Sequence, residues 1–365
     1  MNRAVSDAAS LRDPAAWLAE HADALDEGRS EIDLLARLAG AGLTRIGVPQ
    51  ALGGANGTSA DVAEAVAALA RHSLTAALLF WGHRCYIEYV LRSDNPALRE
   101  RELPDLLAGR WAGATGMSNA MKFLGGIEPL QITVESPGAP QAGQARWRIH
   151  GSLPWITNLR PREFSVAAGA QPADNGPVPV FAFHASQPGV RRSEDLPLIA
   201  LRGSQTAALR LDGVPAGPEH RLHADLAAWL PDIRPPFLGF QCGMSIGLAR
   251  ASLEAARERS GKRDVLAPRL AELDRRLGAD AGALFTGLNH GQFRDDAAAL
   301  FRLRIALAQH VQEATALELQ ASGGRAYLRG QSPGFARRWR ETAFVPVITP
   351  SLTQLETQLR EHVQT

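Results

Sequence analysis

The sequence predicts an α+β protein of three consecutive domains: helical over residues 1–112, β over residues 113–222, and a helical bundle over residues 223–365. Apolar residues recur at three- and four-residue spacing towards both ends of the chain, which indicates amphipathic helices. Between these regions, short stretches alternate apolar and polar side chains with a period of two, as half-buried strands do. A chain of 365 residues is long enough for two or three such units.

The first domain has two clear helix signals. Thr58, with Asp61 in the following turn, predicts a helix start ahead of apolar residues at helical spacing. The segment from Leu74 to Leu91 is apolar on all sides, which predicts a helix buried within the protein.

The β domain is predicted from alternation and turn residues. Residues 145–150 and 207–212 alternate apolar and polar side chains. The apolar run 178–183 is interrupted by Pro179, which predicts an edge strand or a bulge because proline donates no ladder hydrogen bond. In the third domain, apolar residues at helical spacing over 300–317 end at Gly323-Gly324, a natural C-terminal cap.

Composition excludes several function classes. The chain is 45% hydrophobic and 21% charged. Its 39 basic residues balance 38 acidic ones, so the protein has no strong net charge that would favour binding to nucleic acid or to an anionic membrane. The sequence contains no run of ~18 apolar residues, which is the length needed to span a bilayer, and no signal peptide is visible. We therefore expect a cytoplasmic protein. Cys85 and Cys242 are expected to be buried, inert thiols. His220 and His223 have no third partner in view, so we expect no metal site.

Four local strings carry a resemblance to a known family. The string at 151–158, Gly-Ser-Leu-Pro-Trp-Ile-Thr-Asn, is the most specific, and it follows a predicted strand. The others are Gly42 to Pro49 with Gly53-Gly54, Arg202 to Thr206, and Gln320 to Tyr327 followed by Arg337 and Arg340-Glu341. Together they resemble the acyl-CoA dehydrogenase superfamily, whose fold is a helical N-terminal domain, a central β-barrel domain and a C-terminal four-helix bundle.

The resemblance implies a bound FAD, or FMN in a monooxygenase-like member. Trp155 offers an apolar plane to the isoalloxazine ring and Thr157 a hydroxyl to a ring heteroatom. Ser118 lies in the nearest match to the flavin-facing loop, and Ser351 keeps a hydroxyl near the cofactor. Gln320, Gly323 and Gly324 are implied to contact the adenosine half of a partner subunit's FAD, within a homodimer or homotetramer.

One departure from the family affects the chemistry directly. Thr349 occupies the position of the usual catalytic glutamate, and its hydroxyl cannot act as a base near neutral pH. A general base contributes about 10²- to 10⁴-fold to a rate, so its loss affects the chemical step itself. The weak alternatives are Asp232 and Glu356 as bases, and His83 as a polar group assisting oxygen transfer.

We therefore expect a flavin-dependent oxidoreductase of acyl-CoA dehydrogenase type that acts on an acyl thioester such as acyl-CoA, or on a related small molecule, and passes electrons to an acceptor. One alternative is a two-component monooxygenase that receives reduced flavin from a separate reductase, because such enzymes share this fold and lack the glutamate. The other is a non-catalytic homologue that binds flavin or an acyl thioester without turnover.

Overall fold

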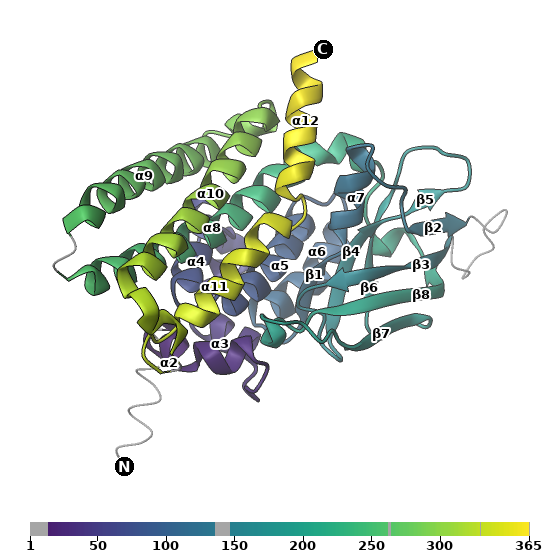
Figure 1. The fold of residues 1–365 in the computed structure, drawn as a ribbon. Coiled ribbons are helices and arrows are strands. Elements are labelled where there is room, and N and C mark those ends of the chain that lie inside the picture. The colour runs from purple at the N-terminus through teal and green to yellow at the C-terminus, as the bar shows by residue number, and fades with distance from the viewer. Residues whose placement is uncertain (1–13, 136–146, 262–263, 329, 365) are drawn as a thin grey trace.

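The computed structural model describes residues 14–135, 147–261, 264–328 and 330–364 (Figure 1). The N-terminal helices are α2 (Pro14–Asp26), α3 (Leu34–Gly40), α4 (Ser59–His72), α5 (Leu74–Leu91) and α6 (Pro96–Leu107). Helix α4 begins with the expected capping box, in which the Thr58 hydroxyl accepts from the Asp61 amide and the Asp61 carboxylate accepts from the Thr58 amide. Helix α5 is buried from Leu74 to Val90, as its uniform hydrophobicity predicts.

The β domain consists of two sheets. One has the order β1-β4-β6-β9 and the other the order β5-β2-β3-β8-β7. The strands are β1 (Ala112–Thr115), β2 (Ile132–Glu135), β3 (Trp147–Ile156), β4 (Phe164–Gly169), β5 (Gln171–Pro172), β6 (Val180–His184), β7 (Val190–Asp195), β8 (Ala207–Ala216) and β9 (Arg221–His223). Trp147 of β3 packs edge-on against Phe181 of β6 at 5.3 Å between ring centroids, which joins the two sheets.

Two features of this domain bear on the sequence-based expectation. Of the two alternatives for the run 178–183, the edge strand is wrong, because β6 pairs with β4 on one side and β9 on the other, and the bulge agrees with a register shift against β9 between Val180 and Phe181. Pro179 is compatible with this position because it precedes the strand and supplies only its carbonyl, which accepts from the Ala170 amide. Residues 117–124 form helix α7 (Met117–Leu124), where the sequence predicts only short strands and turns.

The C-terminal helices are α8 (Leu226–Ser260), α9 (Ala267–Asn289), α10 (Ala297–Ser322), α11 (Phe335–Phe344) and α12 (Leu352–Gln364). Figure 1 shows α8, α9 and α10 running side by side, with the β domain at the opposite end of the molecule. Helix α10 ends at Gly323, whose φ of 59° lies in the left-handed region, so this glycine serves as the predicted cap. None of the described helices is both long and apolar enough to cross a membrane.

Helix α8 joins the bundle to the N-terminal domain by a close approach to α4. A Cβ atom on Gly243 would lie 2.3 Å from the Ala63 carbonyl oxygen, and one on Gly247 would lie 2.0 Å from that of Ala67. Two glycines four residues apart therefore let the two helix backbones touch. The C-terminal bundle and the N-terminal helices consequently share one hydrophobic core.

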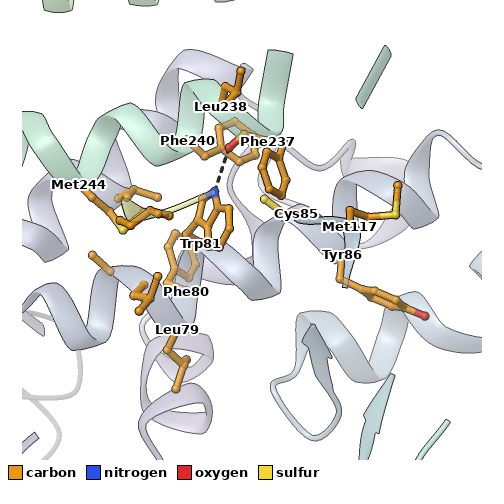
Figure 2. Packing of buried hydrophobic residues seen from close by; sticks show 14 of the residues in the cluster. Leu79, Phe80, Trp81, Cys85, Tyr86, Met117, Phe237, Leu238, Phe240 and Met244 are labelled. Carbon is orange, nitrogen blue, oxygen red and sulfur yellow. Dashed lines mark hydrogen bonds between the residues drawn. The ribbon is translucent and has the colours of Figure 1, made fainter. Parts of the chain in front are cut away.

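Helix α5 packs against α8 through Trp81 (Figure 2). The Trp81 indole N–H donates to the Phe237 carbonyl at 2.9 Å, and the two rings meet edge to face at 5.0 Å between centroids. Cys85 lies in the same region, and both it and Cys242 are buried and free. Burial raises the pKa of Cys242 to about 12, so this thiol stays protonated and unreactive, as predicted for both cysteines.

The contact between α4 and α8 gives a matched pair of substitutions. Gly247→Ala should destabilise the protein by about 2–3 kcal/mol, because the added methyl group meets backbone that cannot move aside. Gly278→Ala in α9 has open space around it and should stabilise the protein by about 0.5–1 kcal/mol through helix propensity. Urea denaturation of the two variants measures both effects. Equal stability changes would contradict the close helix contact.

Candidate functional site

A cavity of about 240 Å³ lies where the three domains meet. Helix α5 contributes one apolar side, strand β3 an aromatic side, helix α7 a polar end, and the segment after α11 the remaining wall. The lining residues are Leu78, Trp81, Thr115, Gly116, Ser118, Asn119, Lys122, Glu128, Gln131, Leu153, Pro154, Trp155, Thr157, Phe344, Val347, Ile348 and Thr349. A concave, mostly apolar site with a few convergent polar groups is typical of small-molecule pockets.

The aromatic side of the cavity is the end of β3. Trp155 is 45% exposed, which is unusual for so large an apolar side chain, and its plane lies within 23° of the Phe344 ring at 6.2 Å between centroids. The Thr157 hydroxyl lies 3.1 Å from the Thr206 hydroxyl. Asn158 fixes the strand end, because it takes a left-handed φ of 59° and its amide donates to the Gly113 carbonyl at 2.8 Å.

The turn from β1 into α7 forms the neighbouring wall. Ser118 lies in the first turn of α7, and Gly116 precedes that helix. A Cβ atom on Gly116 would lie 2.6 Å from the Leu153 side chain and 2.9 Å from the Ala167 carbonyl oxygen, so only glycine lets the chain pass here without a shift. The turn thus brings Ser118 to the same cavity as Trp155 and Thr157.

A buried guanidinium holds the wall that contains Thr349. Arg304 of α10 is fully buried, and it donates to the Val345 carbonyl and to the Gln241 side chain, both at 2.7 Å. Gln241 in turn donates to the Thr349 carbonyl at 3.0 Å. Burial lowers the pKa of Arg304 below its ordinary value. The burial of Arg304 has a signal in the sequence. Arg304 follows Leu300 by four positions and so lies on the apolar face of its helix.

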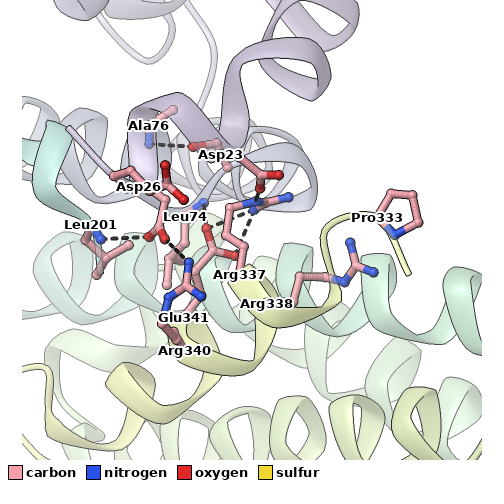
Figure 3. Close-up of polar contacts among 12 residues, drawn as sticks. Asp23, Asp26, Leu74, Ala76, Leu201, Pro333, Arg337, Arg338, Arg340 and Glu341 are labelled. Atoms are coloured by element: carbon pink, nitrogen blue, oxygen red, sulfur yellow. Dashed lines mark hydrogen bonds and ion pairs between the residues drawn. The ribbon is translucent and has the colours of Figure 1, made fainter. Parts of the chain in front are cut away.

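Helix α11, which leads into this wall, is held by buried ion pairs (Figure 3). Glu341 is fully buried, accepts from Arg337 at 2.9 Å and accepts from the Leu74 amide at the start of α5 at 3.0 Å. Arg340 pairs with Asp26 of α2 at 2.6 Å, and Asp26 also accepts from the Leu201 amide. Burial raises the pKa of Glu341, against the opposing effect of Arg337.

The polar end of the cavity is a charged group that sequence reasoning missed. The Glu128 carboxylate accepts from the Asn119 amide at 2.8 Å and from the Lys122 ammonium at 3.2 Å. Asn119 is held in turn, because its side-chain oxygen accepts from the Gln131 amide at 2.9 Å. The one available signal was the rarity of lysine, since Lys122 and Lys262 are the only lysines in the chain.

The comparisons with known proteins match this architecture. Residues 11–110 match the family model for the acyl-CoA dehydrogenase N-terminal domain. Mitochondrial isovaleryl-CoA dehydrogenase of Pongo abelii is 24% identical over 205 residues, which is 54% of this chain and 47% of that protein. The chain thus spans about half the length of the curated relative it matches.

Three solved structures share the fold along nearly the whole chain. The FAD complex of PigA has a TM-score of 0.82 at 17% identity and covers 100% of this chain and 98% of its own. Butyryl-CoA dehydrogenase from Megasphaera elsdenii has a TM-score of 0.81 at 17% identity, covering 97% and 98%. Dibenzothiophene monooxygenase TdsC from Paenibacillus sp. A11-2 has a TM-score of 0.74 at 17% identity, covering 96% and 95%.

Residues 11–110 thus match the N-terminal domain of the acyl-CoA dehydrogenases, and nearly the whole chain shares the fold of butyryl-CoA dehydrogenase. This three-domain fold is the one the resemblance implies. Of the residues that the acyl-CoA dehydrogenase motifs single out, the structure brings Ser118, Trp155, Thr157 and Thr349 to one cavity. Among the described residues of that lining, Glu128 is the only carboxylate and Lys122 the only cation.

The other candidates for the missing glutamate lie outside the cavity lining. His83 is fully buried; its Nε2–H donates to the Leu106 carbonyl and its Nδ1 accepts from the Gly113 amide, both at 3.0 Å. Burial lowers the pKa of His83 to about 3, so the imidazole is neutral. Asp232 pairs with Arg294, and Glu356 lies on α12, beyond the wall formed by 344–349.

The remaining predicted cofactor residues lie at other places. Gln320 accepts from Arg269 at 3.0 Å near the end of α10, and Gly323 and Gly324 follow it. Ser351 follows the cavity wall, and its hydroxyl lies 2.9 Å from that of Thr353. In the described parts of the chain, no three His, Cys, Asp or Glu side chains are grouped to hold a metal ion.

The buried pair behind the cavity wall predicts a stability effect. Glu341→Gln should destabilise the protein by about 3 kcal/mol, because it leaves buried Arg337 without its main partner. The control is Glu254→Gln, which removes a pair with Arg71 in which both side chains are nearly half exposed, and it should cost about 0.2–1 kcal/mol. Chemical denaturation measures both. A loss for Glu341→Gln no larger than the control would contradict the anchoring role of this carboxylate.

Proposed function

We propose that the protein is a flavin-dependent oxidoreductase of acyl-CoA dehydrogenase type, which holds FAD at the interdomain cavity and acts on a small acyl thioester. One observation carries the proposal. A half-exposed indole, Trp155, and two hydroxyls, Ser118 and Thr157, meet in a cavity built from all three domains. A flavin ring needs an apolar plane with a few hydrogen-bonding groups at its edge.

The residues present fit this cofactor. The near-parallel rings of Trp155 and Phe344 provide flat apolar surfaces, and Thr157 and Ser118 provide hydroxyls. About 240 Å³ is small for a ligand pocket, so it suits a ring system and a short acyl group, with the dinucleotide tail outside. When bound, FAD supplies a hydride acceptor.

The tail is expected to continue towards a second copy of the chain. Gln320, Gly323 and Gly324 would contact the adenosine half of that copy's FAD, as their motif implies. The exposed Tyr327 and Leu328 beside them are apolar surface that a partner subunit would cover. We therefore propose a homodimer or homotetramer, with a separate electron acceptor.

The chain's own residues exclude water and orient the substrate. Leu78, Trp81 and Leu153 form apolar walls, which lower the local dielectric and strengthen polar contacts inside the cavity. Arg304 and Gln241 fix the Thr349 segment, so that wall is preorganised. The substrate class is supported by the printed names of the relatives, which are dehydrogenases of isovaleryl-CoA and butyryl-CoA.

A second candidate function rests on Thr349. This residue lines the cavity where the family's glutamate is expected, and a threonine hydroxyl cannot take up an α-proton near neutral pH. A monooxygenase supplied with reduced flavin has no need of that base, and the likeness to TdsC supports the same scaffold for such chemistry.

The flavin placement is tested by removing the aromatic wall. Trp155→Ala should weaken FAD binding by roughly 10- to 100-fold, because stacking on an aromatic side chain contributes about 1–3 kcal/mol. Trp339→Ala is a matched control, since Trp339 is 46% exposed but lies on α11 outside the cavity. Flavin fluorescence titration of the apoprotein measures both affinities. If the Trp155→Ala variant binds FAD as tightly as the wild type, the flavin does not bind against Trp155.

The reaction is tested by an anaerobic visible spectrum of the FAD-loaded protein before and after butyryl-CoA and isovaleryl-CoA. Bleaching of the oxidised-flavin band is the expected result for a dehydrogenase. Tight binding of chemically reduced flavin without bleaching would favour the monooxygenase. Failure to bind either oxidised or reduced flavin would indicate a non-catalytic homologue.

A further inference from the structure

A base that replaces the family's glutamate has to face the interdomain cavity. A general base must lie within hydrogen-bond reach of the proton that it removes, or reach it through one water. Only groups that face the cavity meet this condition. Among the described lining residues, Glu128 alone carries a carboxylate, and no histidine lines the cavity.

We propose that Glu128 is the catalytic base, and that Asn119 and Lys122 are its positioning residues. This inference rests on the proposed function. Glu128 comes from the loop that follows α7 and lines the same cavity as Thr349. In this chain the catalytic carboxylate would thus come from the segment after α7, whereas the family's usual glutamate comes from the segment after α11.

The surroundings of Glu128 suit this role. Its two carboxylate oxygens have separate partners, Asn119 on Oε1 at 2.8 Å and Lys122 on Oε2 at 3.2 Å. Each oxygen can accept more than one hydrogen bond, so both partners leave lone pairs free for a proton. The side chain of Glu128 is 26% exposed and that of Lys122 is 28% exposed, so the pair is reachable from the cavity without being fully solvated.

Lys122 positions the Glu128 carboxylate through an ion pair, with the ammonium nitrogen 3.2 Å from Oε2. Lysine is a compact point charge on a flexible stem, whereas arginine grips a carboxylate with two parallel hydrogen bonds. The sequence uses arginine at all but two of its 39 Lys and Arg positions, so the lysine here leaves Glu128 less tightly held than arginine would.

The proposed step balances as an ordinary dehydrogenation. The α-carbon of the saturated thioester gives its proton to a Glu128 oxygen, and the electron pair of that C–H bond forms the new double bond. The hydride of the β-carbon would go to the oxidant of the proposed function, the flavin. The products would be the α,β-unsaturated thioester, the reduced oxidant and protonated Glu128.

Proton removal is measured directly by exchange of the thioester α-protons in D₂O. FAD-loaded wild-type protein and Glu128→Gln are incubated anaerobically with butyryl-CoA, and deuterium at the α-carbon is followed by NMR. The variant should lose exchange by about 100-fold or more, together with flavin bleaching. Its FAD affinity and melting temperature should stay close to wild type, because glutamine keeps the shape and the Asn119 contact.

Two variants control for the loss of a carboxylate elsewhere. Asp232→Asn and Glu356→Gln remove carboxylates that lie outside the cavity, and both should keep wild-type exchange. Exchange by Glu128→Gln within about threefold of wild type overturns the assignment of the base alone. A wild-type protein that binds FAD but neither exchanges α-protons nor bleaches overturns the dehydrogenase function together with this base.

Discussion

The buried carboxylate of Glu341 determines where the C-terminal part of the chain meets the N-terminal domain. It bonds to Arg337 within α11 and to the first amide of α5, two elements far apart in the sequence. An ionised group that has lost its hydration remains buried only when its partners are fixed in place. The end of α11 is thereby held, and with it Phe344 and the segment that carries Thr349 to the cavity.

A second buried charge supports the same segment from behind. Arg304 has no carboxylate partner among the ion pairs of the described residues, and it donates instead to Val345 and to Gln241. Neutral acceptors around a buried cation fix backbone positions without adding a negative charge near the cavity. The backbone of this wall is thus held from behind, while Glu128 and Lys122 in the same cavity remain partly exposed.

Local sequence predicted the elements whose stability is local. The capping box at Thr58, the buried helix from Leu74 and the glycine end of α10 all follow from residues within a few positions of each other. Helix α7 was missed because its eight residues contain only part of an apolar stripe and no capping side chain. For β6 the sequence left an edge strand and a bulge as alternatives, because pairing with β4 and β9 is set by segments elsewhere in the chain.

The sequence by itself predicted the order of the helical, β and helical regions, the resemblance to the acyl-CoA dehydrogenases and the candidate residues Trp155 and Thr157, because these depend on periodicity and on short strings of neighbouring residues. The same strings predict that Thr349 stands at the position of the family's usual glutamate. Only the tertiary structure decided which charged groups share a cavity with that threonine. Glu128 and Lys122 lie more than 200 positions away in the chain, and their approach depends on the packing of α7, β3 and the segment after α11. Convergence of side chains across domains has no signature in a single sequence, since it is fixed by long-range burial and not by local spacing.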